Sequence, residues 1–388
     1  MARAGANRSG LIIRTARVYS GLFMLAFVTA HLLNLSLGVF SGDAMNKAKP
    51  FLTGIWSNPV MGSLLLTALV VHFLIGLWAI YRRPTLRTNP QDLVQLLSGI
   101  CVVPLLATHV VGVMSLKLNG IPFDYAIALK FFWVDRPEIG LLQVILLSVV
   151  WIHGCAGLIT WLRSKSDMRN VLGWLYPLAV AVPVMALTGY AEVGRQVLIE
   201  VQSQAAPSGY YETEPAASTS IPQPARTEPI RLPYEQVKRI TNGIIWWSIA
   251  LAALTLIARE VRVRVQSSQV VVIRRGNAPA LASTSQLSVL DSFRAHHQPH
   301  ASLCEGRGRC GTCAVRVTGF EYPLPEPTAL EIKTLRRIGA TEDMRLACQL
   351  TPAGGHLSVE PVYPADFTFE ESEHAHPIPP PDMKQAQT

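Results

Sequence analysis

Long apolar stretches separated by polar segments make up most of the first half of the chain. Each contains about 20 residues, enough for an α-helix to cross ~30 Å of hydrocarbon at ~1.5 Å per residue. The first is too long for the apolar part of a cleaved signal peptide, and further spans follow it, so we expect it to be retained. The six predicted helices cover 18–40, 59–81, 94–116, 140–162, 172–191 and 240–258.

After residue 265 the pattern changes to short runs. Residues 270–274 form a β-branched run, residues 276–277 mark a turn, and residues 314–318 alternate as a strand does. Residues 288–295 carry apolar side chains on one side, as a short helix does. The pattern therefore predicts an α-helical transmembrane bundle of six spans, followed by a small α+β domain at 266–365.

Composition agrees with a membrane protein, since 49% of the 388 residues are hydrophobic and only 15% are charged. The segment between the fifth and sixth spans is rich in Pro, Ser, Ala and Glu, so we expect it to be mostly irregular, with a short helix at its start. The predicted organisation is a basic cytoplasmic N-terminus at 1–17, a five-helix membrane domain at 18–192, an extracytoplasmic irregular loop at 193–239, a sixth helix at 240–260, the α+β domain at 266–365 and a disordered tail at 366–388.

Basic residues gather at alternate ends of the predicted helices. The positive-inside rule makes that side cytoplasmic, which predicts a bacterial inner-membrane protein with both termini and the α+β domain on the cytoplasmic side. The net charge of +8 is largely explained by this topology, so we expect lipid and no nucleic acid as a partner. The basic residues are Arg3, Arg8, Arg14 and Arg17; Arg82, Arg83 and Arg87; Arg163, Lys165 and Arg169; and Arg259, Arg262 and Arg264.

Four cysteines carry the clearest chemical signal. Cys304, Cys310 and Cys313 follow a C-x5-C-x2-C spacing, and Cys348 lies further on. A [2Fe–2S] cluster requires four thiolates, and three close ones with a distant fourth is the ferredoxin pattern. A structural zinc site is the alternative, but such a site normally offers a second close pair, which this chain lacks.

Glycines in the same loop permit positive φ and close approach of backbone N–H groups to sulfur. They are Gly306, Gly308 and Gly311. Residues 269–363 resemble a [2Fe–2S] ferredoxin of the β-grasp type, and the segments 287–294 and 345–349 match its pattern. The loop has one residue more than the plant-type spacing and is similar to the adrenodoxin-like branch. Two interpretations of the loop residues Arg307 and Arg309 stay open: steering of an acidic partner, or ordinary loop charges.

Four histidines give the second signal, one in each of the first four predicted spans. His31 lies ~21 Å and His72 ~15 Å from the cytoplasmic surface by helical rise. His109 reaches the depth of His31, and His153 that of His72. The depths predict an outer pair, 31/109, and an inner pair, 72/153, each an axial ligand pair for a haem. For any single histidine, a core residue bonded to a neighbouring carbonyl or hydroxyl is the alternative.

The four helices with one histidine each are similar to the dihaem cytochrome b membrane anchor of succinate dehydrogenases and quinol:fumarate reductases. That resemblance covers about residues 16–191 and implies electron exchange with a membrane quinone. The sequence contains no Cys-x-x-Cys-His, so the two haems would be b-type. No residue is assigned to a quinone pocket or to a catalytic role.

An anchor of this kind followed by a ferredoxin resembles the N-terminal sensory part of bacterial class III adenylate cyclases. The residues that carry this likeness are 306–313 and 335–340. About 25 residues follow the α+β domain, so we expect no cyclase activity from this chain itself. Two functions stay open. One is quinone-linked electron transfer, an oxidoreductase if the protein is an enzyme. The other is a redox sensor that signals to a cytoplasmic effector such as a separate cyclase.

Overall fold

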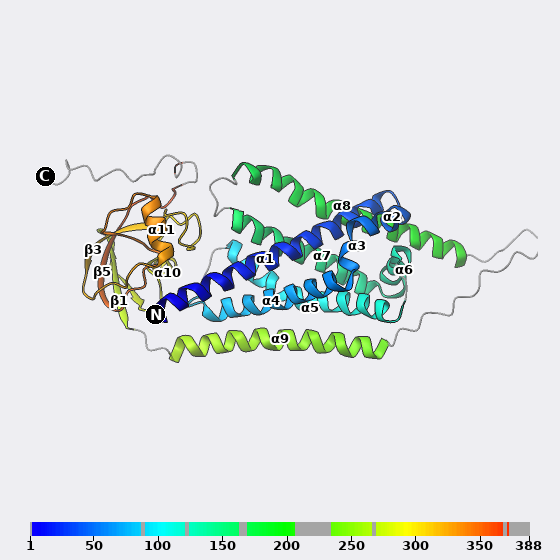
Figure 1. Cartoon of the computed structure of the whole chain (residues 1–388), viewed down its shortest axis with the longest axis horizontal. Helices are drawn as coiled ribbons and strands as arrows, with labels where there is room; N and C mark the ends of the chain where they lie inside the picture. The colour runs from blue at the N-terminus through cyan, green and yellow to red at the C-terminus, as the bar shows by residue number, and fades with distance from the viewer. Residues whose placement is uncertain are drawn as a thin grey trace, which may run out of the picture.

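The computed structural model describes residues 2–86, 90–120, 124–162, 169–205, 234–265, 269–367 and 371. Figure 1 shows an elongated helical bundle with a small sheet domain at one end. The start of the first helix lies at that same end, and the last bundle helix leads into the sheet domain (Figure 1).

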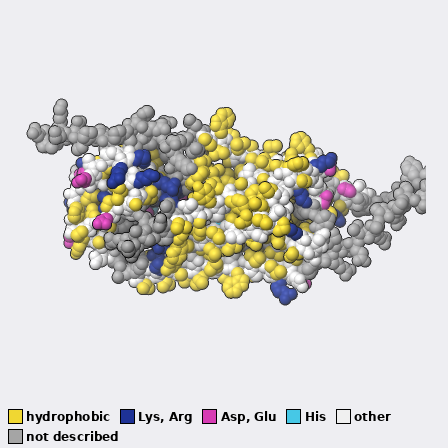
Figure 2. All heavy atoms as spheres, viewed as in Figure 1, with side chains coloured by type: hydrophobic (Ala, Val, Ile, Leu, Met, Phe, Trp, Pro, Cys, Tyr) yellow, Lys and Arg dark blue, Asp and Glu magenta, His cyan; other side chains and the backbone are white. Residues whose placement is uncertain are grey.

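Six helices of the described residues are long and apolar enough to cross a membrane, which confirms the predicted number. Shorter helical segments join them: η1 Leu37–Val39, α2 Gly42–Leu52, α3 Gly54–Ser57, α6 Tyr125–Lys130 and η2 Phe131–Asp135. On the face drawn in Figure 2, hydrophobic side chains cover the middle of the bundle and most Lys and Arg side chains lie toward its two ends. The six long helices are α1 Ala2–Ser36, α4 Pro59–Arg82, α5 Pro90–Leu118, α7 Pro137–Leu162, α8 Arg169–Ala205 and α9 Tyr234–Val265.

Three helix boundaries differ from the predicted domain limits. Helix α1 begins at Ala2, so the described part of the predicted basic segment 1–17 is helical. Helix α8 continues to Ala205, and α9 begins at Tyr234. The segment predicted as a mostly irregular loop at 193–239 begins with helix, as expected at its start, and is also helical at 234–239, where a loop was expected. Residues 206–233 lie outside the described residues. The extension of α8 has a packing reason, because Val193 and Val197 are buried in a cluster around Met45 of α2.

The bundle is built from two neighbouring helix pairs. Helix α1 packs on α4, and α5 packs on α7. Helix α8 covers α1, while α9 lies against α4 and α5. Leu32, Trp151 and Ala186 join α1, α7 and α8 in one buried cluster, and Trp151 Nε1 donates a hydrogen bond of 2.7 Å to the Ala179 carbonyl.

The sheet domain contains one five-stranded sheet of order β2-β1-β5-β3-β4. The central pair β1 and β5 is parallel, and the other neighbouring pairs are antiparallel. Helices α10 Val289–Ala295 and α11 Ala329–Arg337 accompany it. This order is consistent with the predicted β-grasp arrangement. The strands are β1 Val270–Arg275, β2 Leu281–Thr284, β3 Ala314–Phe320, β4 Met344–Leu346 and β5 Gly355–Pro361.

The core of this domain contains residues of the predicted β-branched run 270–274 and of the apolar side of the predicted helix 288–295. Val271 and Ile273 of β1 are fully buried, as is Phe293 of α10. Ser288 caps α10 by accepting a hydrogen bond from the Asp291 N–H, which places the helix start one residue after the predicted one. Most of the predicted disordered tail at 366–388 lies outside the described residues.

Candidate functional site

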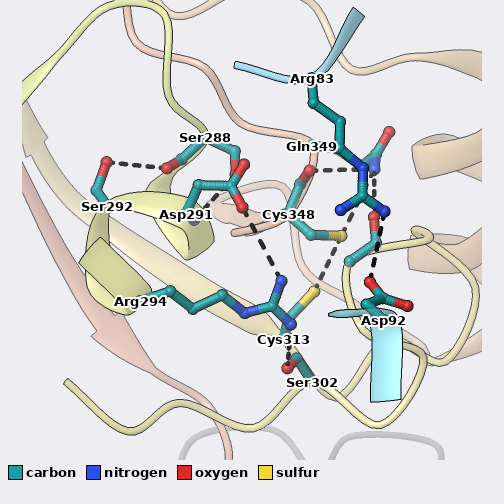
Figure 3. A network of polar contacts seen from close by, with 11 residues as sticks. Arg83, Asp92, Ser288, Asp291, Ser292, Arg294, Ser302, Cys313, Cys348 and Gln349 are labelled. Carbon is teal, nitrogen blue, oxygen red and sulfur yellow. Dashed lines mark hydrogen bonds and ion pairs between the residues drawn. The ribbon is translucent and has the colours of Figure 1, made fainter. Parts of the chain in front are cut away.

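The cysteine loop lies between α10 and β3, and Cys348 follows β4 closely. The sulfur atoms of Cys313 and Cys348 are 3.3 Å apart (Figure 3). At the other side of the loop, the Cys304 N–H donates to the Cys310 sulfur over 3.3 Å. Cys304 and Cys313 are almost fully buried, with exposed fractions of 2% and 1%. The fold therefore brings all four predicted ligands to one loop and the segment beside it.

The loop takes a conformation that glycine favours. Gly306, Gly308 and Gly311 have φ of 90°, 65° and 86°. A Cβ on Gly311 would lie 2.6 Å from Ile338 Cγ2, so no larger residue fits there without movement. Glu305 also has positive φ, at 56°, although it is not a glycine. The positive φ predicted for these glycines is therefore confirmed, and close packing is a second reason for glycine at position 311.

The segment that carries Cys348 is held by a buried ion pair that the sequence interpretation missed. Arg345 Nε donates to Glu331 Oε1 over 2.9 Å, and Nη2 donates to Oε2 over 3.1 Å. Glu331 is fully buried, and its Oε1 also accepts from the Leu346 N–H at 2.9 Å. The Ala347 N–H then donates to the Cys313 carbonyl over 3.0 Å. This chain of contacts fixes the distance between the third and fourth cysteines.

The thiols fall into two pairs, 304/310 and 313/348. The hydrogen bond between Cys304 and Cys310 lowers the pKa of Cys304, whereas the contact with Cys348 and burial raise the pKa of Cys313. Among the described residues, no three His, Cys, Asp or Glu side chains are placed to hold one metal ion. Two separate pairs of thiols are the ligands that a binuclear cluster requires, because each of its two irons binds two thiolates from the protein.

Residues 278–353 match the family described as the 2Fe-2S iron-sulfur cluster binding domain. All four cysteines lie within the matched range. This match supports a [2Fe–2S] cluster in the sheet domain and, with it, iron–sulfur electron transfer. No solved structure matches the chain.

In the bundle, the structure brings the four histidines together in the two predicted pairs. The ring centroids of His31 and His109 are 6.0 Å apart. Those of His72 and His153 are 6.2 Å apart. A metal–imidazole bond of about 2.0 Å and about 1.1 Å from nitrogen to ring centre would give a spacing of about 6 Å for two rings on one metal ion. The spacing of the ring centroids in each pair is therefore compatible with two imidazoles on one metal ion.

The two inner histidines have matching partners. His72 Nδ1 lies 3.1 Å from the Arg17 carbonyl and 3.1 Å from Ser20 Oγ. His153 Nδ1 lies 3.1 Å from the Gln95 carbonyl and 3.2 Å from Ser98 Oγ. A carbonyl accepts only from a protonated nitrogen, so Nδ1 carries the hydrogen in both rings. The unprotonated Nε2 is then the atom that could bind a metal, and hydrogen bonding at Nδ1 fixes ring orientation.

These partners follow an internal repeat that the sequence interpretation missed. Ser20-Gly21 precedes His31 as Ser98-Gly99 precedes His109, with nine residues between glycine and histidine in both cases. The glycines make room for the opposing rings, because a Cβ on Gly21 would lie 3.0 Å from His72 Cε1 and one on Gly99 2.8 Å from His153 Cε1. The repeated Ser-Gly-x9-His pattern is the signal that could have found these residues.

The outer pair has different partners. His109 Nδ1 lies 3.0 Å from Gln143 Oε1 of α7. His31 stacks on Phe27, with ring centroids 5.9 Å apart. Phe27 in turn contacts Trp56 of α3 edge to face. The two pairs therefore lie in distinct surroundings, a polar one for the inner pair and a more aromatic one for the outer pair.

Proposed function

We propose that this protein is a membrane-bound electron-transfer protein that links a quinone pool, two b-type haems and a [2Fe–2S] cluster. The observation that carries the proposal is the arrangement of the histidines. Two pairs with the spacing of shared axial ligands lie at two levels of one bundle, and the cysteine loop lies at the bundle end nearer the inner pair. The haems and the cluster would supply one-electron chemistry that no amino-acid side chain of the sites offers.

His31 with His109, and His72 with His153, are the proposed haem ligands. Hydrogen bonds at Nδ1 hold the His72 and His153 rings in their orientation. Gly21 and Gly99, which have no side chain, leave the space that these two rings occupy. Cys304, Cys310, Cys313 and Cys348 are the proposed cluster ligands. With both axial positions filled by imidazole, the iron of each haem would be six-coordinate and low-spin.

The helices support a membrane location. Six of them are long and apolar enough to span a bilayer, and the arginines at the start of α1 and the ends of α4 and α9 lie at the end that carries the sheet domain. We therefore place that end on the cytoplasmic side of a bacterial inner membrane, with lipid around the bundle and a soluble redox partner or effector at the sheet domain. The quinone would reach the bundle from the lipid phase.

A redox titration of the purified protein by optical and EPR spectroscopy tests the proposal. We expect two low-spin haem signals and one [2Fe–2S] signal, together with turnover between quinol and a soluble acceptor. A preparation with one haem or none would contradict the pairing. Full cofactor content without turnover, combined with binding to an effector that changes with the cluster state, would replace electron transfer by redox sensing.

A further inference from the structure

Arg307 of the cysteine loop contacts the helical bundle. Arg307 lies between Cys304 and Cys310, and its Nη1 donates a hydrogen bond of 3.2 Å to the Thr160 carbonyl. Thr160 is in the last turn of α7, where a positive charge is favourable because carbonyl groups at a helix C-terminus carry partial negative charge. The same guanidinium lies 3.6 Å from Asp92 Oδ1 of α5. A single side chain of the loop thus contacts two helices.

These contact points lie close to the inner histidine pair along the chain. Thr160 is seven residues after His153 on α7, or ~10 Å by helical rise. Asp92 is three residues before Gln95, the residue whose carbonyl contacts His153 Nδ1. Asp92 and Arg83 lie in the same network of polar contacts as Cys348 and Gln349 of the sheet domain (Figure 3). Both contacted helices therefore lead directly to one inner histidine.

Charge favours an acidic residue at this place. Arg17 of α1 interacts electrostatically with Arg307, Arg83 and Asp92, and Arg14 with Arg307 and Arg309. Two carboxylates offset the mutual repulsion of these arginines: Glu305 of the loop itself, 3.5 Å from Arg307 Nη2, and Asp92, 3.6 Å away, which is the one that belongs to the bundle. The side chain of Asp92 is 14% exposed and that of Arg307 23%, so solvent screens the pair less than it screens a surface ion pair.

A second set of contacts holds the connection to the sheet domain. Arg259 Nε donates to the Arg83 carbonyl over 3.1 Å, and Arg262 Nη2 donates to the Tyr81 carbonyl over 3.0 Å. Both arginines belong to the last turns of α9, and the carbonyls belong to the end of α4. The helix that precedes β1 is therefore fixed to the bundle. Gln286 Nε2 also donates to the Val263 carbonyl over 3.4 Å, and the loop contact at Arg307 adds a point of attachment on α5 and α7.

We propose that Arg307 and Asp92 form an intrachain docking pair that holds the cysteine loop against the ends of α5 and α7 and so positions it for electron exchange with the inner histidine pair. The effect on electron exchange rests on the proposed function, whereas the docking of the loop on the bundle does not. Arg307 and Asp92 are positioning residues, since neither binds iron in this proposal. Arg307 is interpreted from the sequence either as a residue that steers an acidic partner or as an ordinary loop charge. The docking pair favours the first interpretation, with Asp92 of the same chain as the acidic group.

Two variants of the full-length protein, Asp92→Asn and Arg307→Gln, test the pair from its two sides. Arg316→Gln is the matched control, because Arg316 forms a 3.0 Å ion pair with Asp343 within the sheet domain and has a similar side-chain exposure of 30%. We expect both test variants to slow electron transfer between the bundle and the cluster by about tenfold, since small misplacements of reacting groups have large effects on rate. Cofactor content and midpoint potentials should stay near those of the control.

Hydrogen–deuterium exchange of residues 304–313 gives a readout that does not depend on turnover. Both test variants should lose protection in this loop, and the control should keep it. Wild-type rates and wild-type protection in both test variants would overturn the inference. If the wild-type protein bound no haem, the proposed function would fail, while loss of loop protection in Asp92→Asn would still support docking.

Discussion

The imidazole rings of His72 and His153 meet edge to face, with an interplanar angle of 90° and centroids 6.2 Å apart. They come from α4 and α7, two helices of different pairs, yet their Nδ1 atoms contact the same kinds of group on α1 and α5. The outer rings of His31 and His109 come from α1 and α5 themselves. The two pairs therefore use all four helices that carry a histidine.

Replacement of the histidines should follow this pairing. We expect His72→Ala and His153→Ala to remove the same haem, and His31→Ala and His109→Ala to remove the other, because each pair would supply both protein ligands of one haem iron. Haem content by pyridine haemochrome assay and low-spin EPR signals measure the outcome. His356→Ala, in β5 of the sheet domain, serves as control and should keep both haems. A different grouping of the four variants would refute the pairing.

The pairing was accessible from sequence because depth in a membrane helix depends only on residue count and rise. Nothing beyond an arginine at the helix end was needed to match His72 with His153. The position at which α8 ends could not be predicted from the sequence, because it depends on the packing of Val193 and Val197 in a buried cluster around Met45. Met45 lies about 150 positions away in the chain, and Tyr125 and Leu129 of the same cluster lie about 65 positions away, whereas composition favoured a mostly irregular segment.

The serine hydroxyls should tune the inner site. Loss of a hydroxyl beside an Nδ1–H weakens hydrogen bonding to the ring, which makes the imidazole a poorer donor to oxidised iron. We expect Ser20→Ala and Ser98→Ala to raise the midpoint potential of one haem by up to about 40 mV, the equivalent of about 1 kcal/mol. Optical redox titration measures the shift. Ser20→Thr and Ser98→Thr keep the hydroxyl and should restore the potential, and an equal shift of both haems would contradict the assignment.

The glycines opposite the inner rings should tolerate no side chain. In Gly99→Val, the new Cβ would lie 2.8 Å from His153 Cε1, so the ring must move and overpacking of about 1–3 kcal/mol follows. We expect loss of one haem and retention of the other, measured by haem content and EPR. Gly112→Ala on the same helix is the control, because no atom lies within 4 Å of its new Cβ. Full haem content in Gly99→Val would show that the close contact is not limiting.

The cluster should depend on the distant cysteine as much as on the loop. We expect Cys348→Ser to abolish the EPR signal of the reduced [2Fe–2S] cluster while leaving the haem Soret band unchanged, since the sheet domain and the histidine pairs are separate sites. Cys310→Ser should behave in the same way. Cys101→Ser and Cys155→Ser, both in the bundle, are the controls and should keep the cluster. An unchanged cluster in Cys348→Ser would mean that the fourth ligand is another group.

Glu331 shows where a local pattern points to the wrong role. Thr328-Ala-Leu-Glu331 has the form of a capping box, which places the glutamate at a solvent-accessible helix start. Thr328 does accept a hydrogen bond from the Glu331 N–H at 3.2 Å. The carboxylate, however, points inward to Arg345, and both groups are buried because the segment with Cys348 crosses over the start of α11. A contact between residues distant in sequence therefore determines the role of this glutamate.

Removal of the Glu331 carboxylate should destabilise the cysteine site, although Glu331 is not one of its proposed ligands. In Glu331→Gln, Arg345 keeps its charge in a buried position, where loss of the partner costs about 3–5 kcal/mol. We expect a lower midpoint of thermal unfolding for the sheet domain and a cluster that is lost more readily, followed by circular dichroism and by the visible absorption of the cluster. Replacement of both partners, Glu331→Leu with Arg345→Met, removes the uncompensated charge and should restore much of the stability. If the single variant were as stable as the wild type, the ion pair would not be what holds Cys348 beside Cys313.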